Sequence, residues 1–308
     1  MKMFIILLAA FLISGCADKV ELEDRLYAVT VGLDAEGSKI TMSAGEARLE
    51  SEIGDENEKQ KNAVVSGKNI AEIKQKADMH SDKKLYFGHL KTVVLGKDIL
   101  IDSEKFENIV FDAERMSDIN SRVVVFAAEN AENIVSETMK NDGGGLYLRK
   151  YYRNNGKNEY MDFETIIKAV RENTVFVIPK IKSDENGIVF DGGYLMKGSS
   201  FVGEFSENEI NGLMWLKGEA KGEMIGDEEI SAEVRKEKIT YSDKNIFIKA
   251  DCILKTAGNK NSSICGKIIE NVIKRNIENT INKAVEYGIA ERKEVEVSVN
   301  IVSTGVIK

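Results

Sequence analysis

The sequence of 308 residues is poor in the residue types that build metal and disulfide sites. It contains two histidines, His80 and His89, and three cysteines. Two histidines outside an H-E-x-x-H pattern are weak metal ligands, and no Cys/His spacing matches a zinc site. We therefore expect no metal ion and no cofactor, and we interpret His89 as structural. Cys252, in a predicted strand, and Cys265, at a predicted helix start, are interpreted as free and partly buried thiols, although a disulfide is permitted outside the membrane.

Long apolar runs, proline and an excess of basic charge are also absent from most of the sequence. After the first sixteen residues no stretch reaches eighteen consecutive apolar residues, so we expect no transmembrane helix there. A single proline and 31% charged residues are typical of an ordered globular chain. The 51 acidic residues outnumber the 43 basic ones and give a net charge of −8, which argues in general against binding nucleic acid or an anionic lipid surface.

The N-terminal residues, in contrast, carry an export signal. Lys2 precedes ten apolar residues, Phe4 to Ile13, a run too short to span a bilayer but typical of a secretory signal. The next residues complete a bacterial lipobox pattern, ISGC, that ends at Cys16. We predict that residues 1–15 are a lipoprotein signal peptide and that Cys16 carries the acyl chains, including palmitate, that hold the protein on the outer face of the cytoplasmic membrane. An ordinary signal peptide with a chance cysteine is the alternative.

Hydrophobic periodicity in the first half of the chain predicts a mixture of strands and helices. Alternating apolar residues predict strands, and apolar residues spaced three and four apart predict helices. The predicted strands are residues 26–34, 39–48, 85–95 and 122–128, the last buried on both faces. The predicted helices are residues 67–79, 103–113 with Asp102-Ser103 as its cap, 131–140 and 162–171.

After Pro179 the pattern becomes predominantly β. Strands are predicted at 188–196, 200–205, 230–241, 245–255 and 295–301, and helices at 206–215 and 264–287. The shorter helix opens with a capping box at Ser206, and we expect its Trp215 to be a buried core residue. These elements predict a multi-domain α+β protein with mixed or antiparallel sheets flanked by helices, and a long C-terminal helix followed by a final strand. The predicted domains are 16–172, 173–226 and 227–308.

The sequence shows no catalytic pattern. It lacks a G-x-S-x-G elbow, and the triple glycine at 143–145 lacks the lysine and hydroxyl residue of a phosphate loop. Leu146–Arg153 (LYLRKYYR) interleaves aromatic and basic residues, which is typical of interfaces. Tyr151, Tyr152 and Arg153 are therefore candidate partner contacts. The alternative is a linker that packs its tyrosines on its own domain.

Several separated stretches resemble the Ger(x)C family, the C-subunit lipoproteins of nutrient germinant receptors in bacterial spores. Asp18–Leu22 resembles the start of the mature family sequence, and Ala28–Asp34 resembles its first strand. Leu85–Lys91 (LYFGHLK), followed by Val93–Gly96 (VVLG), is the most similar stretch. The C-terminal half follows the family in order, with resemblances at 177–181, 193–197, 202–203 and 213–218. Together these stretches cover nearly the whole predicted mature chain.

The resemblance implies a three-domain α+β ectodomain on the outer face of the spore's inner membrane. It also implies assembly with a membrane A subunit and a transporter-like B subunit that senses the nutrient, and it implies no catalysis. The sequence departs from the family at Ala17, where tryptophan is usual. It departs again after the helix at 264–287, which passes almost directly into the last strand, whereas family members usually carry a longer segment there.

Two other function classes remain open from the residues alone. A solute-binding lipoprotein needs a deep apolar cleft with convergent polar groups. An envelope hydrolase needs a nucleophile and a base in contact. A structure discriminates among the receptor subunit, the solute-binding lipoprotein and the hydrolase, because it shows whether such a cleft or such a contact is present.

Overall fold

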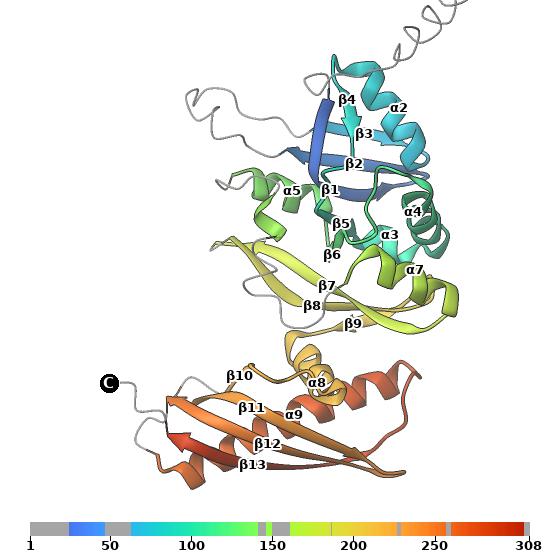
Figure 1. Cartoon of the computed structure of the whole chain (residues 1–308). Helices are drawn as coiled ribbons and strands as arrows, with labels where there is room; N and C mark the ends of the chain where they lie inside the picture. Colours follow the sequence, from blue (N-terminus) through green and yellow to red (C-terminus); the bar gives the residue numbers. More distant parts are fainter. Residues whose placement is uncertain are drawn as a thin grey trace, which may run out of the picture.

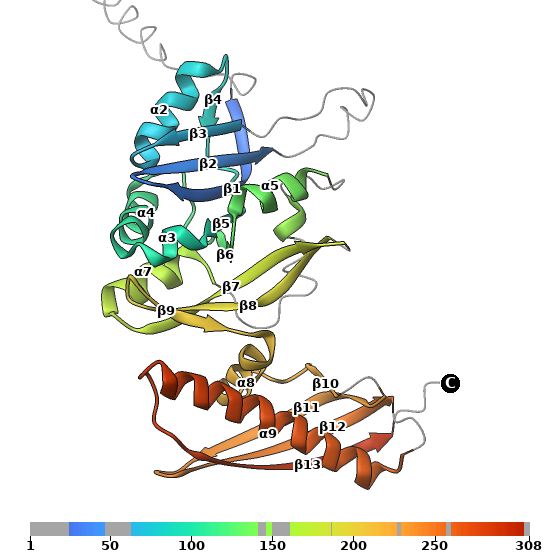
Figure 2. The ribbon, with the colours of Figure 1, turned by 180° about the vertical axis from the view of Figure 1, so that it is seen from behind.

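The computed structural model describes residues 25–46, 63–140, 146–149, 161–185, 187–226, 229–256 and 260–304. These residues form three tiers along one axis (Figures 1 and 2). The first tier contains strands β1 to β6 with their helices, the second contains β7 to β9, and the third contains a separate sheet with one long helix. The predicted α+β class, with mixed sheets and a long helix before the last strand, is confirmed.

The first two tiers share one mixed sheet, which has nine strands in the part of the chain that the structure describes. Its order is β3-β2-β1-β5-β6-β7-β8-β9, and β4 pairs with β1 off this path. Its strands are β1 (Arg25–Glu36), β2 (Lys39–Glu46), β3 (Ala63–Gly67), β4 (Lys84–Tyr86), β5 (Thr92–Gly96), β6 (Val124–Ala128), β7 (Val175–Asp184), β8 (Gly187–Lys197) and β9 (Ser200–Phe205). The parallel link between the two tiers, β6 to β7, is a single register pair, Ala127 with Lys180.

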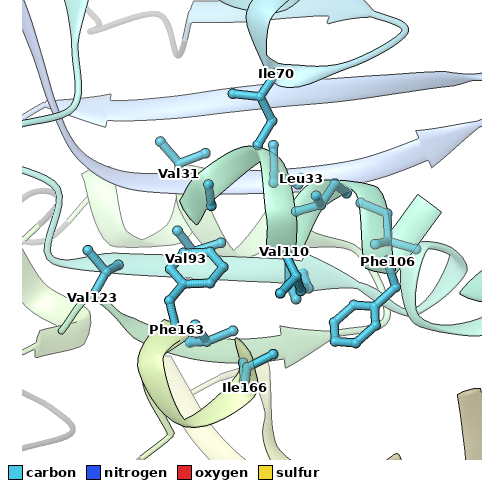
Figure 3. Packing of buried hydrophobic residues seen from close by; sticks show 14 of the residues in the cluster. Val31, Leu33, Ile70, Val93, Phe106, Val110, Val123, Phe163 and Ile166 are labelled. Carbon is cyan, nitrogen blue, oxygen red and sulfur yellow. The ribbon is translucent and has the colours of Figure 1, made fainter. Parts of the chain in front are cut away.

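Helices cover both faces of the sheet in the first tier. They are α2 (Ile70–His80), α3 (Lys97–Ile101), α4 (Ser103–Arg115), α5 (Ala131–Met139) and α7 (Phe163–Glu172). Every residue of β5 and β6 is buried. The buried strand predicted at 122–128 is therefore present from Val124, whereas Arg122 lies before it and is exposed. Successive side chains of a strand point to opposite faces of the sheet. Val93 packs in the cluster that contains residues of α2, α4 and α7 (Figure 3), whereas Val94 and Phe126 pack in the cluster that contains residues of α5.

Among the described residues, the third tier is a four-stranded sheet that packs against the long helix α9 and against the shorter α8. Its elements are α8 (Glu207–Lys217), β10 (Met224–Gly226), β11 (Ser231–Tyr241), β12 (Asn245–Thr256), α9 (Ser262–Glu286) and β13 (Glu294–Thr304). Ile269, Ile273 and Ile277 of α9 recur every four residues and are fully buried against the sheet. The capping box predicted at Ser206 is present, and Gly218 ends α8 in the left-handed conformation, with φ of 74°.

Some predicted elements are corrected by the structure. The strand predicted at 85–95 is two strands, because a turn closed by the Leu90 N–H on the Phe87 carbonyl (2.8 Å) separates β4 from β5. The helix predicted at 67–79 begins at Ile70, after the Asn69 cap, and Gly67 ends β3. The β pattern expected after Pro179 already begins at residue 175. The domain divisions at 172/173 and 226/227 stay predictions.

Candidate functional site

The residues predicted to carry the lipid and the partner contact lie outside the described part of the chain. These are Cys16, Tyr151, Tyr152 and Arg153. Only residues 146–149 of the aromatic and basic stretch are described. Leu148 is fully buried in the α5 cluster, with the half-buried Tyr147 against it. The start of that stretch therefore packs on its own domain, and its second half remains a predicted contact.

Asp34, in the stretch that resembles the family's first strand, has a structural role. Its Oδ1 accepts the Ala131 N–H at 2.8 Å and its Oδ2 accepts the Glu132 N–H at 2.9 Å, at the first turn of α5. Burial raises the pKa of the Asp34 carboxyl, and the two backbone donors offset part of that rise. Asp34 thus fixes α5 onto β1 by satisfying two N–H groups that have no partner within the helix.

His89, predicted in a strand, lies exposed in the turn between β4 and β5, whereas the two cysteines are buried. His89 lies 4.8 Å from the Tyr27 ring, centroid to centroid, and 6.2 Å from the Tyr86 ring. Cys252 and Cys265 are free, as predicted, and they are fully buried. Burial raises the pKa of the Cys252 thiol to about 11, which disfavours the reactive thiolate. Among the described residues, no group of three His, Cys, Asp or Glu side chains could hold a metal ion.

A groove of about 520 Å³ lies between α4 and α7, which is within the size range of small-molecule sites. Its lining combines apolar and charged residues, namely Ala113, Glu114, Ile119, Ser121, Phe163, Glu164, Ile167, Lys168, Arg171 and Glu172. Arg171 already pairs with Glu114 at 2.8 Å, and Arg122 pairs with Glu164 at 3.2 Å. Because much of the lining is charged and internally paired, this groove does not match the apolar cleft of a solute-binding protein.

The most connected polar cluster lies where the first and second tiers meet. Tyr194 of β8 is fully buried, and its hydroxyl donates to Glu129 Oε1 at 2.8 Å. Lys97, at the start of α3, pairs with the same Glu129 oxygen at 3.0 Å and lies 5.6 Å from the Tyr194 ring centroid. Burial alone would raise the pKa of the Glu129 carboxyl, but the hydrogen bonds from Lys97 and Tyr194 outweigh it and lower the pKa.

Lys180 of β7 lies at the centre of this cluster and is only 8% exposed. Its ammonium group pairs with Asp191 at 2.8 Å and with Glu204, and Lys97 approaches Glu204 at 3.8 Å. Burial would lower the pKa of Lys180, but the hydrogen bonds that its ammonium group donates to Asp191 and Glu204 raise it above its usual value. A buried cation is tolerated because two carboxylates surround it. These charges reinforce the link that the β6–β7 backbone makes through one pair.

Glu204 also connects the second tier to the third through its backbone. The Tyr287 hydroxyl, at the end of α9, accepts the Glu204 N–H at 3.1 Å and donates to the Glu204 carbonyl at 3.2 Å. The Tyr287 ring stacks on Phe205 with centroids 6.4 Å apart. A Cβ on Gly203 would lie 2.2 Å from that ring, so glycine allows this close approach. One residue, Glu204, therefore contacts all three tiers.

We name this arrangement the Glu204 junction: Lys97, Glu129, Lys180, Asp191, Tyr194, Glu204 and Tyr287. It joins residues of all three tiers through hydrogen bonds and ion pairs. Sequence reasoning did not find it. One signal was present, because Lys180 interrupts an otherwise buried apolar run in β7, and a buried lysine requires a carboxylate partner.

The fold and the junction define an elongated, three-tiered α+β protein. Residues 18–183, more than half of the chain, match the family model described as the spore germination protein N-terminal domain. The chain belongs to this Ger(x)C family of spore germination proteins, as the sequence resemblance implied.

Two similar proteins agree with this assignment. The spore germination protein YndF of Bacillus subtilis (strain 168) is 21% identical over 174 residues, which are 53% of this chain and 42% of YndF. The chain thus spans less than half the length of that relative. The crystal structure of the GerBC protein superposes with a TM-score of 0.54 at 15% identity, covering 89% of this chain and 97% of GerBC. That likeness shows a shared fold.

Proposed function

We propose that this chain is the lipid-anchored C subunit of a spore nutrient germinant receptor. The observation that carries the proposal is the family match over residues 18–183, which includes all of the described first tier and most of β7. The fold shared with GerBC supports it. In this proposal the protein assembles with membrane A and B subunits and contributes to germination signalling through protein contacts, without catalysis.

The proposed location is the outer face of the spore's inner membrane, with Cys16 as the anchor. The lipobox pattern at residues 13–16 supports the anchor. In the described ranges, every helix is too short or too polar to cross a membrane. Cys16→Ala should prevent lipidation and release the protein from the membrane fraction of spores. An unmodified Cys16 in the intact mass of the wild-type protein would contradict the anchor.

Co-purification from spore membranes tests the receptor assignment. An affinity-tagged chain, solubilised in mild detergent, should recover one A-type and one B-type membrane subunit. A matched strain that carries Cys16→Ala should recover much less of both, because the protein no longer accumulates at the membrane. Recovery of the lipidated protein without membrane partners, together with normal nutrient response in its deletion strain, would overturn the assignment.

We also propose that the second half of the Leu146–Arg153 stretch contacts a partner. Tyrosine and arginine dominate binding hot spots. Changing Tyr151, Tyr152 and Arg153 together to serine should leave stability unchanged and weaken partner recovery. Tyr147→Ser is the matched control, because Tyr147 packs on the α5 cluster and its loss should lower stability instead. A triple variant that is destabilised would show that these residues belong to the core.

A further inference from the structure

One end of the first tier gathers cations, tyrosines and an exposed methionine. We call it the tether end and define it by Arg25, Tyr27, Met79, Lys83, Lys84, Tyr86 and His89. The parallel pairing of β1 with β4 places Arg25 beside Lys84 and Tyr27 beside Tyr86. Figures 1 and 2 show β4 and the last turn of α2 at one end of the molecule and the third tier at the opposite end.

The aromatic rings of the tether end hold one another in place. The Tyr27 and Tyr86 rings meet edge to face, with centroids 5.8 Å apart, and the Arg25 guanidinium lies 4.5 Å from the Tyr86 ring centroid. Both tyrosines are half-buried and His89 is exposed. These rings therefore form a supported surface with polar groups at its edge, rather than part of the core.

An apolar side chain projects beside these rings. The Leu85 N–H donates to Asp78 Oδ1 at 2.7 Å and fixes the last turn of α2 against β4. That turn carries Met79, which is 73% exposed, more than any other large apolar side chain in the described ranges. Exposing a methionine to water has a hydrophobic cost, which contact with an apolar phase removes.

The tether end is locally basic although the whole chain carries −8. Among the described residues of this end, the three cations Arg25, Lys83 and Lys84 outnumber the two carboxylates, exposed Asp82 and half-buried Asp78. Tyrosines with lysines and arginines on apolar stems are the residues that occupy the headgroup layer of membranes.

The number of residues between Cys16 and Arg25 limits how far the tether end can lie from a lipid attached at Cys16. Nine residue steps separate Cys16 from Arg25, and an extended chain spans at most about 3.6 Å per residue, or roughly 30 Å. If Cys16 is the anchor, the tether end lies within that distance of the lipid and the third tier lies farther away. Resting on that proposed anchor, we infer that the tether end docks directly on phospholipid headgroups, with the three cations against phosphates and Met79 at the acyl boundary.

Quenching by lipids tests the docking in the full lipidated chain. A fluorophore is attached to Met79→Cys in one variant and to Val302→Cys in another, because Val302 is 51% exposed in β13 at the opposite end. Both variants are reconstituted in vesicles that carry a headgroup quencher. Quenching should be severalfold stronger at position 79. Each lost cation should weaken binding to an anionic surface by about fivefold, so the triple Arg25→Gln, Lys83→Gln, Lys84→Gln variant should lose quenching at position 79.

Lipid composition and flotation separate the outcomes. Acidic residues precede Arg25 in the sequence and oppose binding to an anionic surface. Vesicles of anionic phosphatidylglycerol and of zwitterionic phosphatidylcholine are therefore compared. Stronger quenching at position 79 in phosphatidylglycerol supports the proposal. Protein that floats with vesicles but shows equal quenching at both positions overturns the docking and leaves the anchor intact. Protein that does not float overturns both. Protection of position 79 in spore membranes but not in pure lipid would assign the surface to a protein partner and overturn lipid docking.

Discussion

Gly212 in α8 should be intolerant of alanine, although alanine is the better helix former. Replacing a helical glycine with alanine stabilises an unhindered helix by about 1 kcal/mol. At position 212 the new Cβ would lie 2.1 Å from Thr280 Oγ1 and 2.3 Å from the Asn276 carbonyl oxygen of α9. Thr280 cannot simply rotate away, because its single O–H is shared between two carbonyl oxygens, that of Glu209 at 2.7 Å and that of Asn276 at 2.8 Å.

The two helices must therefore move apart to accept the methyl group. Overpacking of this kind costs about 1–3 kcal/mol, and here the obstacle includes backbone, so the upper part of that range applies. After the gain in helix propensity, Gly212→Ala should destabilise the protein by about 1–2 kcal/mol. At roughly 2–4 °C per kcal/mol for a chain of this size class, the melting temperature should fall by several degrees.

Gly266→Ala in α9 is the matched control. A Cβ there would meet Ile301 at 3.7 Å and the Val299 carbonyl at 4.0 Å, which are ordinary contacts. This variant should gain up to about 1 kcal/mol from helix propensity. Urea unfolding of both variants, monitored by far-UV circular dichroism, measures whether each substitution raises or lowers the free energy of unfolding. Equal stabilisation by both substitutions would refute the close packing of α8 on α9.

Three further outcomes follow from individual residues. Trp215→Ala should cost about 3–5 kcal/mol, because this indole is buried at 2% exposure; a wild-type fluorescence maximum typical of indole in water would contradict the burial. Cys252 and Cys265 should resist a thiol reagent at pH 8 until urea unfolds the protein, since both are fully buried; rapid labelling of the native protein would contradict this. Lys180→Met should destabilise by about 2 kcal/mol near neutral pH, less than the roughly 3–5 kcal/mol of a fully buried pair, because Asp191 and Glu204 are 31% and 36% exposed. Burial would raise the pKa of its partner Asp191, but hydrogen bonds from Lys180 and a neighbouring lysine lower it. That contribution is present above the unfolded pKa of about 4 and is lost at lower pH, so the difference in urea midpoint from wild type should shrink at pH 3; a constant difference would contradict the ion pair.

The elements that sequence reasoning located best are those with a strong local signal. The capping box at Ser206, the Asp102 cap of α4 and the fully buried β6 are all present as predicted. Their signals lie within a few residues, where propensity and capping chemistry act. The split of 85–95 into β4 and β5 was missed because both halves are apolar. The turn closed by the Leu90 N–H is also held by a distant contact, the Lys91 N–H on the Val29 carbonyl at 2.8 Å.

The Glu204 junction shows why the central polar cluster could not be predicted from the same signals. Its hydrogen bonds join residues 65 and 83 positions apart, Tyr194 with Glu129 and Glu204 with Tyr287. Each of these residues also has a common local interpretation, as a strand tyrosine or a solvated surface carboxylate. What distinguishes them is that three tiers meet at Glu204, which only the topology determines.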